Sequence, residues 1–153
     1  MIIVMPQLAD NLKIRLSQIG EPVIDVPAPH QMDGAFDSSQ LSVQYNVLVK
    51  VIRPESRVDV VVSMAYLLGQ TKLFSGSLTT GFEVVELASY ITREEGVEAF
   101  RIDSDFLPML INIAFSTTRG YFARDLQGTV LAPYPFPMIP MDSIRKRTSY
   151  RLI

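Results

Sequence analysis

Apolar residues recur at three- and four-residue steps between residues 104 and 127, the spacing of a helix with one buried face. The members of this apolar stripe are Leu107, Leu110, Ile111, Ala114, Phe115, Thr118, Tyr121 or Phe122, and Leu126. Gly128 predicts the end of the helix. Met109 and Ile113 lie outside the stripe, so we expect the helix to be buried on two sides, one against the protein's own sheet and the other against a second copy.

Alternation of apolar and polar residues predicts four β-strands before this helix. They span residues 12–25, 41–52, 58–68 and 72–87, and Gly20 and Pro22 predict a bend or bulge in the first. The proline-rich segment between the first two strands predicts a long crossover loop, whereas short loops join the last three strands into an antiparallel meander. This order predicts a single α+β domain, residues 1–153, in which a helix covers one face of a four-stranded antiparallel sheet.

The fourth predicted strand contains two glycines and is followed by a charged segment. Gly76 and Gly81 interrupt the strand and are expected to weaken its pairing or to mark bulges. The charged segment 89–103 predicts a short helix or loop at the surface.

Composition narrows the classes of function. With 153 residues, 48% of them hydrophobic, the chain can form one domain with a buried core. The formal net charge of −2 does not favour nucleic acid or an anionic membrane as a partner, and the lack of cysteine excludes disulfides and thiolate metal sites. The first residues do not resemble a signal peptide, and no apolar run approaches the roughly 20 residues of a membrane span. We therefore expect a cytoplasmic protein without membrane insertion.

The chain carries no catalytic or cofactor motif that we recognise. His30 is the only histidine and lies in the proline-rich loop without a nucleophile motif, so we interpret it as a surface residue. Glu94 and Glu95 lie in a polar context typical of a solvated surface. Arg119, in the middle of the helix, is expected to form an ion pair within the domain or between subunits. We therefore expect a protein that is not an enzyme and holds no metal or cofactor.

Several short motifs, in their order and spacing, resemble the SecB-type export chaperones over residues 12–144. The matching residues are Glu21, Asp25 and Pro27 at the end of the first strand, Gly81 and Phe82 in the last, Arg119 in the helix, Gly128 and Thr129 at its end, and Pro140, Met141 and Asp142 at the start of a last helix. The resemblance implies a SecB-like α+β fold with a four-stranded antiparallel sheet, a long helix, a proline-rich arm and a short C-terminal helix. It further implies a chaperone that holds unfolded or precursor polypeptides, for protein export, as a homo-oligomer such as a dimer or tetramer.

A chaperone of this kind needs an exposed apolar groove with adaptable side chains. The arm at residues 132–141 and the crossover at residues 23–36 supply the two walls of such a groove. The candidate peptide-binding residues are Val23, Val26, Met32, Phe36, Tyr134, Phe136, Met138, Ile139 and Met141. The alternative is that these residues pack in the core of the domain itself.

The resemblance also bears on partners. Members of the family that dock on the SecA motor alternate leucine with an acidic residue where this chain has Ser75 and Ser77, so we expect SecA to bind weakly or not at all, although Glu21 and Asp25 remain. The candidate oligomer interface consists of Leu107, Met109, Ile113 and Arg119.

Two other functions stay open at this point. One is a SecB-like partner module dedicated to a single client such as an antitoxin. The other is an adaptor that uses the fold to oligomerise and contacts its ligand through the basic tail. The basic residues of that tail are Arg145, Lys146, Arg147 and Arg151.

Overall fold

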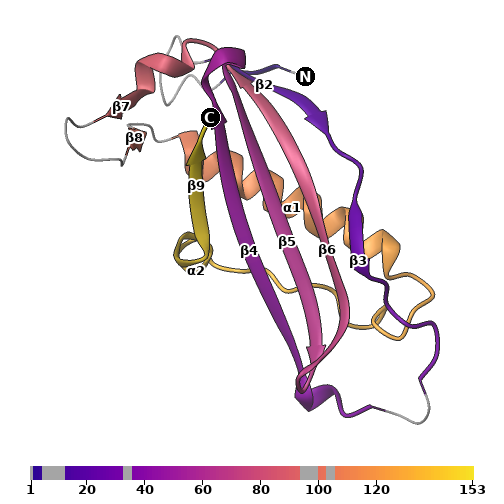
Figure 1. Cartoon of the computed structure of the whole chain (residues 1–153). Coiled ribbons are helices and arrows are strands. Elements are labelled where there is room, and N and C mark those ends of the chain that lie inside the picture. Colours follow the sequence, from indigo (N-terminus) through magenta and orange to yellow (C-terminus); the bar gives the residue numbers. More distant parts are fainter. Residues whose placement is uncertain (1, 5–12, 33–35, 94–99, 103–105) are drawn as a thin grey trace.

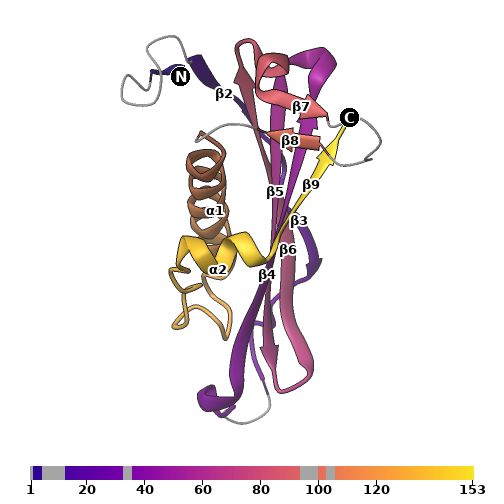
Figure 2. The same cartoon turned by 90° about the vertical axis from the view of Figure 1, so that its left-hand side faces the viewer.

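The computed structural model describes residues 2–4, 13–32, 36–93, 100–102 and 106–153. These residues form a large mixed sheet with one long helix against one of its faces, an α+β arrangement (Figure 1 and Figure 2). The strands of the large sheet are β1 (Ile2–Val4), β2 (Lys13–Ile19), β3 (Val23–Val26), β4 (Leu41–Ile52), β5 (Arg57–Leu68), β6 (Thr71–Val84) and β9 (Thr148–Leu152). The helices are α1 (Phe106–Asp125) and α2 (Met141–Lys146), with short 3-10 helices η1 (Ser38–Gln40), η2 (Arg53–Glu55) and η3 (Leu87–Tyr90).

The large sheet has seven strands in the order β1-β2-β6-β5-β4-β9, and β3 also pairs with β6. The predicted meander is confirmed, since β4, β5 and β6 pair antiparallel in sequence. The predicted first strand is divided at residues 20–22 into β2 and β3, and both halves pair with β6. The four-stranded, wholly antiparallel sheet was nevertheless wrong, because β1 adds one edge and β9 adds the other in parallel to β4.

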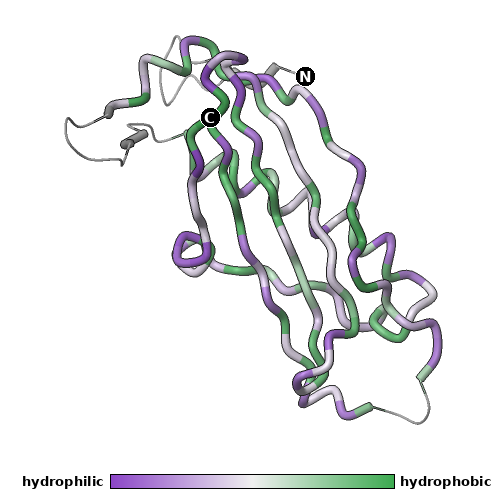
Figure 3. Tube along the Cα trace, viewed as in Figure 1, coloured by the Kyte–Doolittle hydropathy of each residue, from purple (hydrophilic) through white to green (hydrophobic). Residues whose placement is uncertain are grey.

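Burial along β4 follows the predicted alternation. Val47, Val49 and Val51 are almost completely buried on the face that α1 covers, while Gln44 and Asn46 on the other face are exposed. Figure 3 shows the corresponding hydrophobic stretches in the strands of the sheet. The apolar–polar alternation along β4 therefore reflects the covering of one face of the strand by α1.

The two glycines of β6 do not interrupt its pairing with β5. Register shifts lie opposite both glycines in the strands on the other side, between Leu16 and Gln18 in β2 and between Ile24 and Val26 in β3. The β5–β6 ladder has its own shift away from the glycines, between Tyr66 and Leu67. The expectation that these glycines mark bulges is thus confirmed, whereas the alternative that they weaken the pairing of β6 is wrong for its ladder with β5. The glycines allow the close approach of these neighbouring strands, because a Cβ at Gly76 would lie 2.9 Å from the carbonyl oxygen of Val23.

The buried face of α1 matches the predicted stripe and identifies Phe122, not Tyr121, as its member near the C-terminal end. The buried residues are Phe106, Leu107, Leu110, Ile111, Ala114, Phe115, Thr118 and Phe122. Gly128 has a positive φ of 77° after the helix, as expected for a C-terminal stop. No described helix is long and apolar enough to cross a membrane.

The described part of the segment after β6 begins with a short helix, as predicted, but then forms two short strands that were not predicted. η3 is followed by β7 (Ile91–Arg93), which pairs antiparallel with β8 (Phe100–Ile102) in a separate two-stranded sheet. Glu94 and Glu95 lie outside the described residues.

Candidate functional site

The crossover between β3 and β4 lies beside the segment that follows α1 (Figure 1). His30 donates from Nδ1 to the carbonyl oxygen of Gly128 at 3.2 Å, and the backbone N–H of Val130 donates to the carbonyl of Pro29 at 3.0 Å. The rings of Phe36 and Tyr134 lie 5.6 Å apart between centroids. We call this contact zone the crossover–arm seam. The two predicted groove walls are therefore adjacent, and His30 is an exposed anchor between them.

Local sequence explains why the chain turns into the arm where it does. Thr129 donates from its hydroxyl to the carbonyl of Leu126 at 2.6 Å, and the same hydroxyl accepts from the N–H of Leu131 at 3.2 Å. The first bond satisfies a carbonyl of the kind that the end of a helix leaves unpaired, and the second fixes the start of the arm. Leu131, with 0% of its surface exposed, then anchors the beginning of the arm in the core.

Farther along, the arm is held by its backbone carbonyls and by one aromatic ring. The Tyr66 hydroxyl of β5 donates to the carbonyl of Tyr134 at 2.7 Å, and Arg119 of α1 donates from Nε to the carbonyl of Phe136 at 3.2 Å. The Phe136 ring packs 5.6 Å from Tyr66 and 6.2 Å from Phe115. Arg119 thus binds a backbone carbonyl, and no described carboxylate lies within ion-pair range of it, so the expected ion pair within the domain is not found.

Exposure separates the candidate peptide-binding residues into three groups. Met138 and Val23 are the most exposed, at 82% and 55%. Phe136 is only 6% exposed and belongs to the core, which contradicts its assignment to an open groove wall in this conformation. The half-buried residues are Val26, Met32, Phe36, Tyr134, Ile139 and Met141. Apart from Phe136, the candidates therefore retain surface that another chain can reach.

Tyr66 links the arm to the sheet and is buried. Burial raises the pKa of the Tyr66 phenol to about 12, while the positive charge of Arg119 acts in the opposite direction. The phenol therefore remains a hydrogen-bond donor to Tyr134 well into the alkaline range.

Replacing Tyr66 with phenylalanine is expected to remove part of the alkaline sensitivity of the fold. The unfolded chain releases the phenol proton near its ordinary pKa of 10.0, whereas the folded protein keeps it until about 12. The unfolded state then binds fewer protons in this window, so the free energy of unfolding of the parent protein should fall as the pH rises through it. Urea unfolding measured at several pH values should show a shallower fall for Tyr66→Phe; parallel curves would contradict the assignment.

The face of the sheet opposite α1 carries the residues expected at the SecA-type surface. Ser75 is 8% exposed, Ser77 is half-buried, and Glu21 and Asp25 are exposed. Ser75 and Asp25 line a hollow of about 160 Å³, whereas Glu21 and Ser77 lie outside it. Its other lining residues are Gln44, Tyr45, Asn46, Ser63, Met64, Ala65, Lys72 and Gly76. The lining is thus mostly of small and polar residues.

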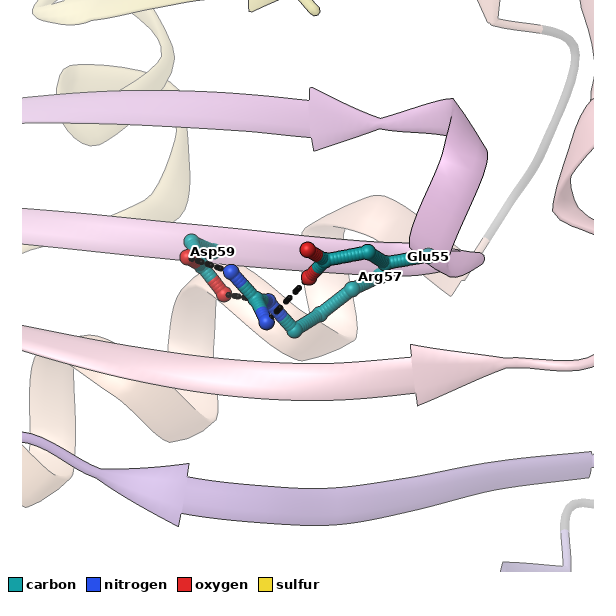
Figure 4. Close-up of polar contacts among 3 residues, drawn as sticks. All are labelled: Glu55, Arg57 and Asp59. Carbon is teal, nitrogen blue, oxygen red and sulfur yellow. Dashed lines mark hydrogen bonds and ion pairs between the residues drawn. The ribbon is translucent and has the colours of Figure 1, made fainter.

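Sequence reasoning missed a charged cluster on the same face, Glu55–Arg57–Asp59 (Figure 4). Arg57 donates to both carboxylate oxygens of Asp59, at 2.9 and 3.2 Å, and pairs with Glu55. These bonds raise the pKa of the Arg57 guanidinium, the hydrogen bond to Asp59 first among the causes. Asp59 is 7% exposed, and a Cβ at Gly81 would lie 2.9 Å from its Oδ1. The sequence feature that could have indicated this cluster is the two-residue spacing of Arg57 and Asp59, because residues two apart in a strand lie on the same face.

The outward face of α1 differs from its buried stripe. Met109 and Ile113 are half-buried at the margin of the core, and nothing lies within 4 Å of the position of a Cβ on Gly120. Leu107, expected at an oligomer interface, is 6% exposed and already buried within the protomer, so its burial requires no second copy. An open surface hollow here is lined by Ser116, Thr117, Gly120, Tyr121 and Arg124.

The described residues contain no group of three or more His, Cys, Asp or Glu side chains placed to hold a metal ion. Comparison with known proteins gives no match to a family model, a curated protein or a solved structure.

Proposed function

We propose that this protein is a SecB-like cytoplasmic chaperone that holds non-native polypeptides as a homo-oligomer. The observation that carries the proposal is the exposure of Met138, at 82%, in the arm four residues after Tyr134 of the crossover–arm seam. Methionine is flexible and adapts to many apolar partners, which suits a surface that holds varied unfolded chains. The prolines on both sides of Met138 fix φ in the arm and so reduce the ordering cost of binding.

The seam fits this role because it presents apolar side chains on segments whose backbone is held in place by hydrogen bonds. Tyr66, Arg119, His30 and Val130 hold the arm and crossover by hydrogen bonds, so their backbone positions are fixed. The half-buried Met32, Phe36 and Tyr134 lie along it. An unfolded chain can then be held mainly through apolar contacts that do not depend on one sequence.

Replacing Met138 with glutamine is expected to weaken suppression of aggregation of a denatured client and to leave stability within about 0.5 kcal/mol, since the side chain is exposed. Light scattering of the client measures the first effect, and thermal unfolding measures the second. Val85→Gln is the matched control. Val85 is also an exposed apolar residue, at 51%, but it follows the last residue of β6 and is not part of the arm. Equal holdase activity of Met138→Gln, Val85→Gln and the parent protein would refute the assignment of the seam.

The homo-oligomer is proposed to form through the outward face of α1. Met109, Ile113, Thr117 and Tyr121 follow one another at four-residue steps, and the open space at Gly120 allows close approach of a second helix. We expect light scattering to give a dimer or larger species of the 17.1 kDa chain at micromolar concentration. Gly120→Arg should shift it toward the protomer with the fold retained, because the substitution adds bulk and charge only on the open side. A monodisperse protomer for the parent chain would exclude the interface.

For the SecA motor, we propose weak or absent docking. The serine pair on β6 offers neither the leucine nor the negative charge that the resemblance implies for that contact. Glu21 and Asp25 stay exposed at one side of the same surface. The apolar side chains of the seam favour binding of many client sequences over recognition of a single one.

A further inference from the structure

The strand β9 forms one edge of the large sheet, at the opposite side from β1 and β3 (Figure 1). Within the described part of the chain, β4 is the only strand that pairs with it. The crossover–arm seam lies beside the other edge, where β3 begins the crossover. The free side of β9 is therefore a second surface, separate from the seam.

Backbone hydrogen bonds show which groups of β9 face outward. The N–H of Val47 donates to the carbonyl of Arg147 at 3.0 Å, and the N–H of Ile153 donates to the carbonyl of Val51 at 2.8 Å. In a parallel ladder, the N–H and C=O groups of one residue point to the same side, and alternate residues point to opposite sides. The N–H and C=O groups of Thr148, Tyr150 and Leu152 therefore point away from β4.

Side chains on and before this edge are strongly basic. Arg145, Lys146, Arg147 and Arg151 are all exposed, and Arg151 pairs in register with Lys50 of β4. Figure 3 shows α2, which leads into β9, as a hydrophilic segment. Asp142 is the one described acidic residue in the segment from α2 to the end of β9. The edge thus combines a concentration of positive charge with outward backbone groups that no other described strand pairs with.

From this combination we propose that β9 is a docking strand for an acidic, extended segment of a partner polypeptide, which adds to the sheet as a further strand. Main-chain hydrogen bonds would supply affinity, and the arginines would select negative side chains. A second copy of this chain is disfavoured as the occupant, because β9 against β9 would bring the same basic residues together. Tyr150, 48% exposed, offers an apolar contact beside the added strand.

The proposal is tested with a fluorescently labelled peptide in which glutamate alternates with valine and threonine. Tyr150→Pro removes an outward N–H without removing a bond to β4, and Tyr150→Val is its matched control because it loses the same side chain but keeps the N–H. In fluorescence anisotropy, Tyr150→Pro should bind about tenfold more weakly than Tyr150→Val, and Arg151→Glu about tenfold more weakly than the parent protein. Binding should weaken with added salt.

Two further measurements separate edge pairing from other forms of binding. The same peptide with lysine in place of glutamate should not bind, and Met138→Gln should bind the acidic peptide as the parent protein does. Amide hydrogen exchange at Tyr150 and Leu152 of the parent protein should slow when the acidic peptide is added. Equal affinity of the Tyr150→Pro and Tyr150→Val variants, or unchanged exchange with saturating peptide, would overturn the proposal.

Discussion

Replacing Phe136 with alanine is expected to lower the free energy of unfolding by about 3 to 5 kcal/mol, the usual loss for a buried phenylalanine. The ring is 6% exposed and packs between Tyr66 of β5 and Phe115 of α1. Removal of the ring would leave a cavity between the arm, the sheet and α1. It would also weaken the hydrogen bonds that Tyr66 and Arg119 donate to carbonyl groups of the arm. Urea unfolding followed by circular dichroism measures the change.

Met138→Ala is the matched control for this experiment. It removes a long apolar side chain from the same arm, but at a position that is 82% exposed, so the free energy of unfolding should change by less than about 0.5 kcal/mol. A similar loss for both variants would show that the arm contributes as a whole segment and not through the Phe136 ring. An unchanged stability for Phe136→Ala would place the ring outside the core.

Replacing Gly76 with valine is expected to destabilise the protein by about 2 to 3 kcal/mol through overpacking. A Cβ at this position would lie 2.9 Å from the Val23 carbonyl oxygen, 3.0 Å from Cζ of Phe122 and 3.1 Å from Cδ1 of Ile24. The first of these is a backbone atom, which cannot move without shifting β3. Because β3 leads into the crossover, hydrogen exchange at Val23 and Ile24 should also become faster.

Gly120→Ala provides the comparison for this glycine. Nothing lies within 4 Å of its Cβ position, and alanine favours a helix over glycine, so the variant should be as stable as the parent or more stable by about 0.5 to 1 kcal/mol. If Gly76→Val were as stable as Gly120→Ala, the close approach of β3 to β6 would not be a constraint on the sequence.

Much of the fold could be predicted from the sequence because its strongest patterns are local. The alternation in β4 placed Val47, Val49 and Val51 on the buried face, and the helical stripe identified Leu110, Ile111 and Phe115. These patterns depend only on the strand and helix periods and on which face is covered. They could not show β9, since the five-residue segment TSYRL becomes a strand only when the arm and α2 deliver it to the edge of β4.

The candidate site was less predictable for a related reason. Apolar residues between prolines look alike in sequence whether they enter the core or remain at the surface, as Phe136 and Met138 do two positions apart. The resemblance could indicate the two segments of the seam but not their contacts. The role of Gly81 also required the structure, because the space it leaves is filled by Asp59, a residue of another strand.

The parallel pairing of β9 with β4 has a consequence for how the chain reaches this fold. During synthesis on the ribosome, β4 is made early, whereas its neighbour at the sheet edge is made after α1, the arm and α2. Contacts between segments so far apart in the sequence form late and slow the folding of a domain. Until β9 emerges, the nascent chain exposes an unpaired edge of β4 beside Val47, Val49 and Val51, and this is the interval in which aggregation through that edge is most favoured.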